Sequence, residues 1–550
     1  MKIVIIGGVA GGASAAARLR RLDESAEIVM IDRGGFISFA NCGLPYYVGG
    51  EIEDRDELEL QDPDSFRARF NVDARVFSEA IEIDRAGKTV KIVNVNTGDV
   101  YEERYDKLIL ATGAKPAALP VEGLQNPKVF SLRTIPDAVK LREFIEAEKP
   151  SSAVVVGGGY VGIEMAENLK RSGLDVTMVE AADHVITAID YDMACDVHNY
   201  LRKMGIELLL SNGLKAVREV GGRLEVSLQN GSIAADMAFV AAGVKPDTRL
   251  AAAAGIALNE RGAIIVDDHM RTSDGDVYAV GDAVEVEEIV SGARGYIPLA
   301  GPANKQGRIA ADNICGFDSA YKGSQGSAIV RIFDMTAAAT GLSETAAKAR
   351  GFEIEKVFTY SASHAGYYPG GTEMSVKTIF DKQTGRVLGA QIVGFDGVDK
   401  RCDVLAVAIR AGMTAGQLTE LELCYAPPFS SAKDPVNFAG YVAGNVLTGK
   451  IKQFHWHDVD ALPRDGSATL LDVRTPAEYA RGHIDGFVNI EVDALRENIG
   501  SMDKAKPVYA HCRSGLRSYL ACRILAQNGF DCYNLSGGYR LYESVVKSSI

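Results

Sequence analysis

Residues 153–164, AVVVGGGYVGIE, carry the strongest indication of the fold in this sequence. Four small or β-branched apolar residues indicate a buried strand, a glycine turn follows, and the residues after it have helical spacing. In the pattern Gly-x-Gly-x-x-Gly, Gly157, Gly159 and Gly162 permit a tight turn, close approach of a pyrophosphate and close packing of helix on strand. The stretch therefore predicts a βαβ unit that binds a dinucleotide.

The next strand, residues 175–179, ends at Glu180, about 20 residues after the glycine turn. A carboxylate at this position accepts a hydrogen bond from a ribose 2′-hydroxyl and repels a 2′-phosphate. The residues that follow are Ala181 and Ala182, with no arginine to hold such a phosphate. The sequence thus favours NADH over NADPH at this site.

A similar unit begins the chain. Residues 3–6 (IVII) indicate a strand, residues 7–12 (GGVAGG) a turn, and residues 13–22 a helix, after which a strand over residues 27–31 ends at Asp32. Val9 occupies the position where the middle glycine of the motif is expected. Asp32 at the end of the next strand nevertheless supports a dinucleotide-binding unit. We predict a second nucleotide site here.

Composition excludes several classes of protein. The chain has 550 residues, of which 47% are hydrophobic and 24% charged, as in globular proteins of three or four domains. The net charge of −14 opposes nucleic acid binding. The sequence has no apolar run long enough to cross a membrane, so we expect a cytoplasmic protein. Its eight cysteines form no Cys-x-x-Cys pair, and we expect neither a disulfide framework nor a metal site.

Two further stretches complete a family pattern: ATG at residues 111–113 and TSDGDVYAVGD at residues 272–282. Together with the two glycine turns, they resemble the two-dinucleotide flavoprotein disulfide reductases over residues 1–447. The resemblance implies FAD on the first turn and a nicotinamide cofactor on the second. The implied FAD residues are Gly7, Gly12, Asp32, Ala111, Thr112, Arg133, Asp282 and Ala300, and the implied NAD residues are Gly157, Gly159, Gly162, Glu180 and Gly243.

The candidate redox thiol is Cys42, in SFANCGLPYY at residues 38–47. Most members of the superfamily place a second cysteine five residues later, where this chain has Tyr47. Cys42 must therefore store its oxidation as a mixed disulfide, a persulfide or a sulfenic acid. The stretch resembles the single-cysteine branch, which contains coenzyme A-disulfide reductases, NADH oxidases and NADH peroxidases. A buried apolar cysteine is the alternative, which the neighbouring Gly, Pro and Asn disfavour.

A sulfur substrate is favoured over peroxide. Peroxidase-type relatives carry a histidine in the first glycine turn, where this chain has Val9 and Ala10. Ser14, Arg18 and Arg21 share one helix face. Paired guanidinium groups suit a phosphate-bearing thiol, namely coenzyme A, although a solvated basic face is the alternative. Resemblance to the coenzyme A-disulfide reductases adds further expected ligand residues: Ser38, Asn41, Lys433 and, on a looser match, Arg69.

Two tyrosines are candidate acids. HAGYYPG at residues 364–370 and YAPPFSSAK at residues 425–433 resemble segments of the dimerisation domain. The resemblance implies that Tyr367 and Tyr425 reach across a homodimer to Cys42 and the flavin. A tyrosine hydroxyl can donate a hydrogen bond to a departing thiolate or sulfide. The alternative is that both merely cap the interface.

A third candidate site lies in YAHCRSGLRS, residues 509–518. The spacing Cys-x4-Arg gives a smaller loop than the Cys-x5-Arg cradle of phosphatases, and it suits a persulfide on Cys512. Residues 455–550 resemble a rhodanese domain with Cys512 as sulfur carrier, and a purely structural role is the alternative. The expected loop residues are Arg513, Ser514, Gly515, Leu516 and Arg517, with the two arginines as electrostatic support.

The expected fold class is α/β, with two Rossmann-like dinucleotide-binding domains, an α+β dimerisation domain and a C-terminal α/β rhodanese domain. The expected boundaries are 1–115 with 250–325 for FAD, 116–249 for NAD, 326–447 for dimerisation, 448–454 for a linker and 455–550 for the rhodanese domain. We expect a homodimeric NADH-dependent reductase of persulfide, polysulfide or coenzyme A disulfide. The alternatives are an NADH oxidase or peroxidase acting through a sulfenic acid, and a flavin redox sensor.

Overall fold

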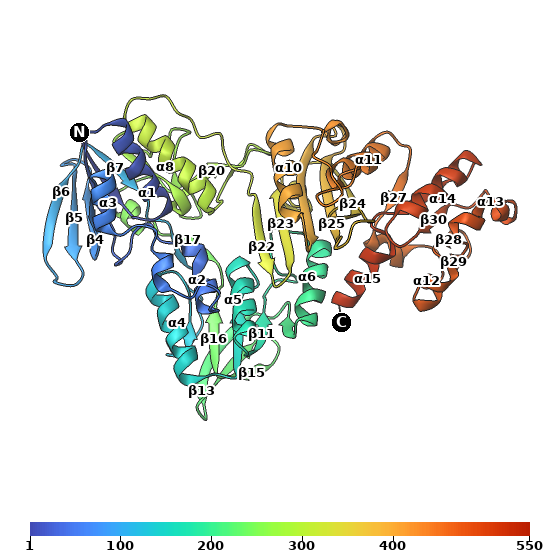
Figure 1. The fold of residues 1–550 in the computed structure, drawn as a ribbon, viewed down its shortest axis with the longest axis horizontal. Coiled ribbons are helices and arrows are strands. Elements are labelled where there is room, and N and C mark those ends of the chain that lie inside the picture. Colours follow the sequence, from blue (N-terminus) through green and yellow to red (C-terminus); the bar gives the residue numbers. More distant parts are fainter. Residues whose placement is uncertain (550) are drawn as a thin grey trace. The chain divides into compact units, whose positions relative to one another are not determined.

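A computed structural model describes residues 1–549. The chain forms two compact units (Figure 1). The first unit contains residues 1–182 and 209–326, and the second contains residues 183–208 and the chain from residue 327 onward. Within the described residues, no helix combines the length and the apolar character that crossing a membrane requires.

The first sheet of the first unit is parallel, in the order β19-β7-β1-β2-β3. Its central strand is fully buried at Ile3, Val4 and Ile5, because apolar side chains on both faces pack under helices. Helices α1 and α8 pack against each other beside it (Figure 1). The bounds are β1 (Lys2–Ile6), β2 (Glu27–Ile31), β3 (Asp73–Arg75), β7 (Lys107–Leu110), β19 (Val277–Ala279), α1 (Ala10–Leu22) and α8 (Ala300–Ile314).

The second sheet of the first unit repeats this βαβ arrangement in the order β11-β10-β16-β9. Its elements are β9 (Val129–Phe130), α4 (Ile135–Glu148), β10 (Ser152–Val156), α5 (Tyr160–Arg171), β11 (Asp175–Val179) and β16 (Met237–Val240). Strand β12 (Ile206–Leu209) spans the boundary between the units in the sequence. The predicted strands over residues 153–156 and 175–179 lie in β10 and β11.

Small antiparallel sheets and short helices complete the first unit. The sheets are β4 (Ser78–Asp84), β5 (Thr89–Asn94) and β6 (Val100–Arg104); β13 (Leu214–Val220), β14 (Arg223–Leu228) and β15 (Ser232–Ala235); and β8 (Ala114–Pro116) with β17 (Val244–Pro246). A mixed sheet contains β18 (Ile264–Ile265), β20 (Val284–Glu287) and β21 (Arg294–Gly295). The short helices are η1 (Asn41–Gly43), α2 (Leu44–Val48), η2 (Arg55–Leu58), α3 (Pro63–Phe70), α7 (Arg249–Ala253) and η3 (Gly281–Ala283).

The second unit contains an antiparallel sheet in the order β22-β23-β26-β25-β24. Strand β26 is buried at every position, because α10 and α6 pack against this sheet. The elements are α6 (Tyr191–Lys203), β22 (Ala328–Ile332), β23 (Met335–Gly341), α9 (Glu344–Ala349), β24 (Ile354–Ala362), β25 (Glu373–Asp381), β26 (Val387–Gly394), α10 (Val398–Arg410), η4 (Gln417–Glu420) and α11 (Pro435–Leu447).

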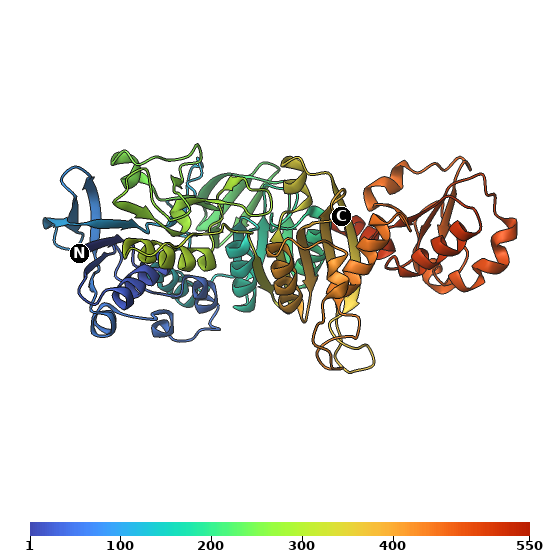
Figure 2. The ribbon, with the colours of Figure 1, turned by 90° about the horizontal axis from the view of Figure 1, so that it is seen from above.

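The C-terminal part of the second unit is a parallel sheet in the order β27-β31-β30-β28-β29, flanked by helices (Figure 2). Residues 452–454 of the segment that we expected to link the domains form its edge strand, β27. The elements are β27 (Lys452–Phe454), η5 (Trp456–Ala461), β28 (Thr469–Asp472), α12 (Pro476–Arg481), β29 (Val488–Asn489), η6 (Val492–Ala494), α13 (Leu495–Asn498), η7 (Ile499–Ser501), β30 (Val508–His511), α14 (Leu516–Gln527), β31 (Cys532–Leu535) and α15 (Gly538–Ser548).

Helix α15 packs on α6 within the second unit. Asn199 Nδ2 donates a hydrogen bond to the backbone oxygen of Ser544 at 2.9 Å. His198 is buried, and its Nδ1 lies 2.8 Å from Ser548 Oγ. Burial lowers the pKa of His198 to about 3, so this imidazole is neutral at neutral pH.

Candidate active sites

The first glycine turn leaves no room for side chains at two positions. Gly7 has a φ of 105°, and a Cβ atom there would lie 2.2 Å from the backbone oxygen of Ala111. A Cβ at Gly12 would lie 1.8 Å from the backbone oxygen of Gly7. The turn therefore requires glycine at both positions so that α1 begins directly behind β1.

The second turn repeats this geometry at Gly157 and Gly162, where a Cβ would lie 2.3 and 1.9 Å from backbone oxygens. Gly159 is different, because it is exposed and a Cβ there would meet open space. That open face at the start of α5 is where a dinucleotide phosphate approaches in this fold. Gly243, beyond β16, is also exposed, with a φ of 89°.

Asp32 and Glu180 make equivalent contacts at the two strand ends. Asp32 Oδ2 accepts a hydrogen bond from the Gly8 N–H at 2.9 Å. Glu180 Oε2 accepts one from the Gly158 N–H at 2.6 Å. Each carboxylate is thus held beside its glycine turn, where a nucleotide ribose would bind. Burial raises the pKa of Asp32.

Several implied FAD residues gather near Asp282, in η3. A Cβ at Gly113 would lie 3.1 Å from Arg133 Nη2. Burial raises the pKa of Asp282, and the Arg133 guanidinium opposes that shift. Thr112 Oγ1 and the Tyr296 hydroxyl are buried without a hydrogen-bond partner among the described residues. The glycine cradle and these orphaned polar atoms fit a bound group that carries hydroxyls and phosphates, as FAD does. Ala300 begins α8.

Cys42 lies in η1, and its side chain is exposed. Partial burial, followed by the carboxylates of Glu164 and Asp282, raises the pKa of its thiol. The thiol form therefore prevails until another group stabilises the thiolate. All eight cysteines, including Cys42, are free thiols.

Two neighbours fix the segment after Cys42. Arg142 places its guanidinium carbon 4.6 Å from the ring centroid of Tyr47 and donates to the Tyr47 backbone oxygen. Tyr46 donates a hydrogen bond to Glu164 Oε1 at 3.1 Å. Asn41 Oδ1 is buried without a hydrogen-bond partner among the described residues. The aromatic side chain that replaces the second cysteine thus anchors the thiol segment.

A cavity of about 450 Å³ opens between α1, α3 and α8. Five of the seven expected coenzyme A residues line it: Ser14, Arg18, Arg21, Ser38 and Arg69. Asn41 is not among the lining residues, and Lys433 belongs to the second unit. The structure adds residues that the sequence analysis missed, namely Leu60, Gln61, Phe66, Phe70, Asn304 and Arg308, besides the small Ala13 and Ala17.

The cavity is strongly basic. Arg18 forms an ion pair with Asp312 at 2.6 Å, whereas Arg21, Arg69 and Arg308 are exposed. The rings of Phe66 and Phe70 lie 4.9 Å apart at the wall. Guanidinium groups bind phosphates, so the cavity suits a molecule that carries phosphates.

The two candidate tyrosines lie in adjacent loops of the second unit. Tyr367 is in the loop of residues 363–372 between β24 and β25, and Tyr425 is in the loop of residues 421–434 before α11. Their hydroxyl oxygens lie 2.9 Å apart, and both side chains are exposed. The hydrogen bond that Tyr367 shares with Tyr425 raises the pKa of Tyr367. In Figure 2 these two loops, coloured gold and orange, project from the molecule side by side.

Cys512 follows the end of β30 and is 1% exposed. Its Sγ accepts hydrogen bonds from the Gly515 N–H at 3.1 Å and from the Ser518 hydroxyl at 3.3 Å. Gly515, with a φ of 97°, directs the chain into α14. Backbone and hydroxyl donors of this kind stabilise an anionic sulfur.

Arg517 forms a two-point ion pair with Glu478, with both distances 2.7 Å. Hydrogen bonding from Arg517 lowers the pKa of Glu478 to about 2. The other loop residues, Arg513, Ser514 and Leu516, are exposed or half-buried. Cys512 thus lies in a compact loop whose arginine has a fixed orientation.

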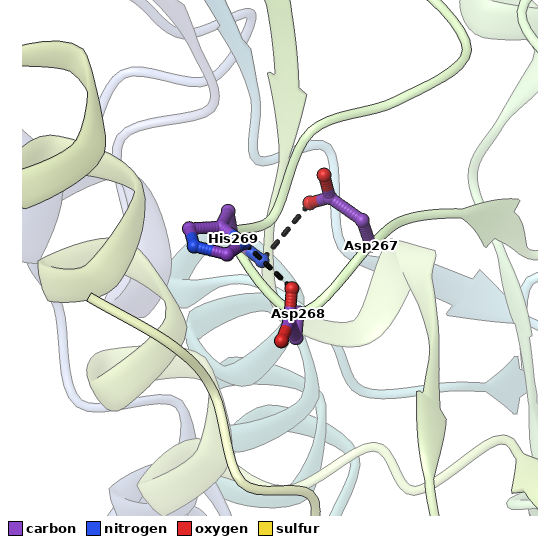
Figure 3. Close-up of side chains that lie close together, drawn as sticks. All are labelled: Asp267, Asp268 and His269. Carbon is purple, nitrogen blue, oxygen red and sulfur yellow. Dashed lines mark hydrogen bonds and ion pairs between the residues drawn. The ribbon is translucent and has the colours of Figure 1, made fainter. Parts of the chain in front are cut away.

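One group of potential metal ligands appears among residues 1–549: Asp267, Asp268 and His269 (Figure 3). His269 Nδ1 lies 2.6 Å from Asp268 Oδ1, and its Nε2 lies 2.8 Å from Asp318 Oδ1. These contacts, the one to Asp318 first, raise the pKa of His269. They therefore favour an imidazolium, which cannot bind a metal.

Comparison with known proteins agrees with this geometry. Residues 1–307 match the pyridine nucleotide-disulphide oxidoreductase family, residues 327–435 match its dimerisation domain, and residues 455–544 match a rhodanese-like domain. A coenzyme A disulfide reductase of Staphylococcus haemolyticus is 34% identical over 443 residues, which cover 80% of this chain and 99% of that protein.

Two solved structures align with nearly the whole chain. The reduced CoADR-RHD of Bacillus anthracis is 46% identical, with a TM-score of 0.97, and the alignment covers 99% of this chain and 98% of that one. The NAD-dependent persulfide reductase of A. fulgidus is 39% identical, with a TM-score of 0.93, over 98% of this chain and 100% of that one.

Proposed function

Because the chain belongs to the pyridine nucleotide-disulphide oxidoreductase family and carries a rhodanese-like domain, we propose that it reduces sulfane sulfur bound to coenzyme A. The observation that carries this proposal is the basic cavity, which reaches Ser38 in the segment of the redox thiol Cys42. Three exposed guanidinium groups match a thiol that carries phosphates, as coenzyme A does. Coenzyme A persulfide is the preferred substrate, and coenzyme A disulfide is reduced by the same site.

The family implies FAD and a nicotinamide cofactor. We assign FAD to the turn of Gly7 and Gly12 with Asp32, and NADH to the turn of Gly157 and Gly162. Bound FAD supplies the passage of two electrons from NADH to sulfur. Glu180 supports NADH over NADPH, because its carboxylate, held by the Gly158 N–H, repels a 2′-phosphate.

The sulfur step uses Cys42 as nucleophile. Its thiolate attacks the outer sulfur of coenzyme A persulfide, so that the S–S bond breaks, Cys42 persulfide forms and the coenzyme A thiolate leaves with a proton. Two electrons from NADH and one proton then release hydrogen sulfide and regenerate the thiolate. With coenzyme A disulfide, the same attack gives a mixed disulfide on Cys42.

The tyrosine pair supplies the proton donor. Tyr367 and Tyr425 share a hydrogen bond at 2.9 Å, and one hydroxyl can donate to the departing thiolate while the other supports it. We propose that the protein is a homodimer, in which this pair acts on Cys42 of the partner subunit. The match to a dimerisation domain and the exposure of both rings support this arrangement.

The C-terminal domain supplies sulfur. The Cys512 thiolate attacks the outer sulfur of a polysulfide, the S–S bond behind that sulfur breaks, and a polysulfide shorter by one sulfur leaves. The Gly515 N–H and Ser518 hydroxyl stabilise the charged sulfur of the resulting persulfide. Coenzyme A thiol then accepts that sulfur and becomes the persulfide on which Cys42 acts. Fusion of the two domains raises the local concentration of the carrier.

Steady-state kinetics with NADH test the proposal. We expect rapid NADH oxidation with coenzyme A persulfide or disulfide, and only slow oxidation with oxygen or peroxide. Vigorous turnover with oxygen or peroxide and none with persulfide would instead establish the oxidase or peroxidase alternative. The redox-sensor alternative predicts that Cys42→Ser preserves function in the cell.

The matched variants are Arg21→Gln in the cavity and Arg261→Gln on an exposed turn outside it. Arg21→Gln should raise the KM for coenzyme A persulfide roughly tenfold, as expected for one lost charge-assisted contact of about 1.5 kcal/mol. The KM for NADH should stay unchanged, and Arg261→Gln should alter neither constant. Equal KM values for the two variants would contradict the assignment of the cavity.

A further inference from the structure

One buried arginine contacts both loops that carry the tyrosine pair. Arg401, on α10, is 1% exposed and is the largest fully buried side chain among the described residues. Its guanidinium lies beneath the loop of residues 363–372 and the loop of residues 421–434. Burying a charged group costs free energy unless the group is paired and hydrogen-bonded.

Arg401 binds the base of the Tyr367 loop. Its Nη2 donates a hydrogen bond to the Ser363 backbone oxygen at 2.8 Å. Ser363 also closes the loop, because its N–H donates to the Thr372 backbone oxygen at 2.7 Å and its Oγ accepts from the Thr372 N–H at 3.2 Å. The guanidinium of Arg401 therefore holds Ser363, the first residue of the Tyr367 loop.

The same nitrogen binds the Tyr425 loop. Arg401 Nη2 lies 3.1 Å from Asp434 Oδ2 and 3.2 Å from Ser430 Oγ, and it contacts the Phe429 backbone oxygen at 3.4 Å. The Ser430 hydroxyl donates to Asp434 Oδ2 at 2.7 Å. Asp434 Oδ1 also accepts from the Val436 N–H at 3.0 Å and so caps α11.

The second guanidinium nitrogen of Arg401 also has a specific contact, with Gly397. Arg401 Nη1 donates to the Gly397 backbone oxygen at 3.2 Å. A Cβ at Gly397 would lie 2.2 Å from the same nitrogen, and the φ of Gly397 is 68°. Only glycine permits this approach. A lysine is one bond shorter and has a single nitrogen, so it cannot bind the Gly397 oxygen and the loop oxygens at the same time.

At the loop tips, no comparable set of contacts from the described residues holds the tyrosines. Tyr367 is 76% exposed and Tyr425 is 49% exposed. Their loops are joined by the hydroxyl pair and by the Ala365 N–H, which donates to the Pro427 backbone oxygen at 3.3 Å. The relative position of the hydroxyls therefore depends on the buried bases of the loops.

We propose that Arg401, paired with Asp434, is a positioning residue that sets the register between the two loops and thereby orients the Tyr367–Tyr425 pair for proton donation. The proton-donation part rests on the proposed function. The positioning part concerns this chain alone and can be measured without turnover.

The first measurement is amide hydrogen exchange of the holoenzyme. Arg401→Lys keeps the charge but loses the fork, so exchange in residues 363–372 and 425–434 should rise roughly tenfold, as local opening becomes easier. The control is Arg464→Lys, because Arg464 also contacts several backbone oxygens but does so in the C-terminal domain. It should leave both loops unchanged.

The second measurement separates the half-reactions by stopped-flow absorbance. Arg401→Lys should leave reduction of bound FAD by NADH unchanged and slow reoxidation by coenzyme A disulfide roughly ten- to hundredfold, the usual effect of a misplaced catalytic group. In the variant with Tyr367→Phe and Tyr425→Phe, adding Arg401→Lys should cause no further slowing, because the groups that it orients are gone.

The outcomes separate the two claims. Unchanged exchange in both loops overturns the positioning role, as does full additivity with the tyrosine variants. If the tyrosine double variant reoxidises as fast as the parent, the proposed proton donors are wrong, whereas the exchange result still decides what Arg401 does. If Arg401→Lys fails to fold, Asp434→Asn provides the same comparison, because it keeps the guanidinium and weakens its main partner.

Discussion

Cys42 and Cys512 are the two thiols proposed to carry sulfur, and their surroundings differ. Cys42 lies in a short 3-10 helix, where partial burial of the thiol and two carboxylates raise its pKa. Cys512 is 1% exposed and already accepts hydrogen bonds from Gly515 and Ser518. The C-terminal loop thus offers donors to an anionic sulfur, whereas the surroundings of Cys42 disfavour its thiolate.

This difference indicates a division of labour. A site that stabilises an anionic sulfur with fixed donors suits storage of a persulfide. A site whose thiolate is disfavoured suits a step in which reactivity depends on binding. Substitution of either thiol should therefore affect a different reaction.

The largest expected effect is that of Cys42→Ser. Serine has no sulfur to accept the sulfane atom, so NADH-dependent reduction of coenzyme A persulfide should fall by at least about a thousandfold. Sulfur transfer from a polysulfide to coenzyme A should continue at the parental rate. The measurement is hydrogen sulfide release with NADH, beside a direct assay of persulfide formation. Reduction that survives in Cys42→Ser would contradict the role of this thiol.

Cys512→Ser should give the reverse pattern. Formation of coenzyme A persulfide from polysulfide should be lost, while reduction of added coenzyme A disulfide should stay within about twofold of the parent, since that reaction needs only Cys42. Steady-state assays with both substrates test this. A parallel loss of disulfide reduction would mean that the two thiols act in one obligatory step.

A smaller effect is expected for Glu478→Gln. The variant removes the ion pair that holds Arg517 at 2.7 Å, so sulfur transfer through Cys512 should fall roughly tenfold, because a misplaced catalytic group is costly. Reduction through Cys42 should not change. Asp493→Asn, at an exposed position of the same domain, is the control. Faster transfer in Glu478→Gln would show that the carboxylate restrains the site.

The last prediction concerns acid stability and not turnover. Burial lowers the pKa of His511 to about 4, so this imidazole is neutral when folded and takes up a proton on unfolding below its ordinary pKa. Stability is therefore lost as pH falls from about 6.5 towards 4, at most about 1.4 kcal/mol per pH unit. His511→Asn should make the melting temperature of the full-length protein depend less on pH in this range. If stability depended on pH as steeply in the variant as in the parent, the acid sensitivity would come from another group, such as the buried His198.

Much of the fold was predictable because it follows from local patterns. Glycines between an apolar strand and a helix permit few structures, and the turns at Gly7 and Gly157 indeed leave no room for a Cβ. The helical spacing of Ser14, Arg18 and Arg21 placed them on one face, and all three line the basic cavity.

Contacts between distant segments were not predictable. Asn304 and Arg308 line the same cavity only because α8 packs on α1, and nothing in their own segment indicates that partner. Arg401 was missed because a single arginine in a helix gives no sign of burial beneath two distant loops. The role of Lys433 stays a prediction, because it lies in the second unit.

The central claim is that Cys42 takes its redox partner from a diffusible thiol with phosphates instead of from a second cysteine of the chain. Intact mass spectrometry of the oxidised protein, followed by peptide mapping, tests it most directly. We predict one coenzyme A attached to the Cys42 peptide, released by reduction and absent from Cys42→Ser. A bare or over-oxidised Cys42 in a protein that does not bind coenzyme A would contradict the account.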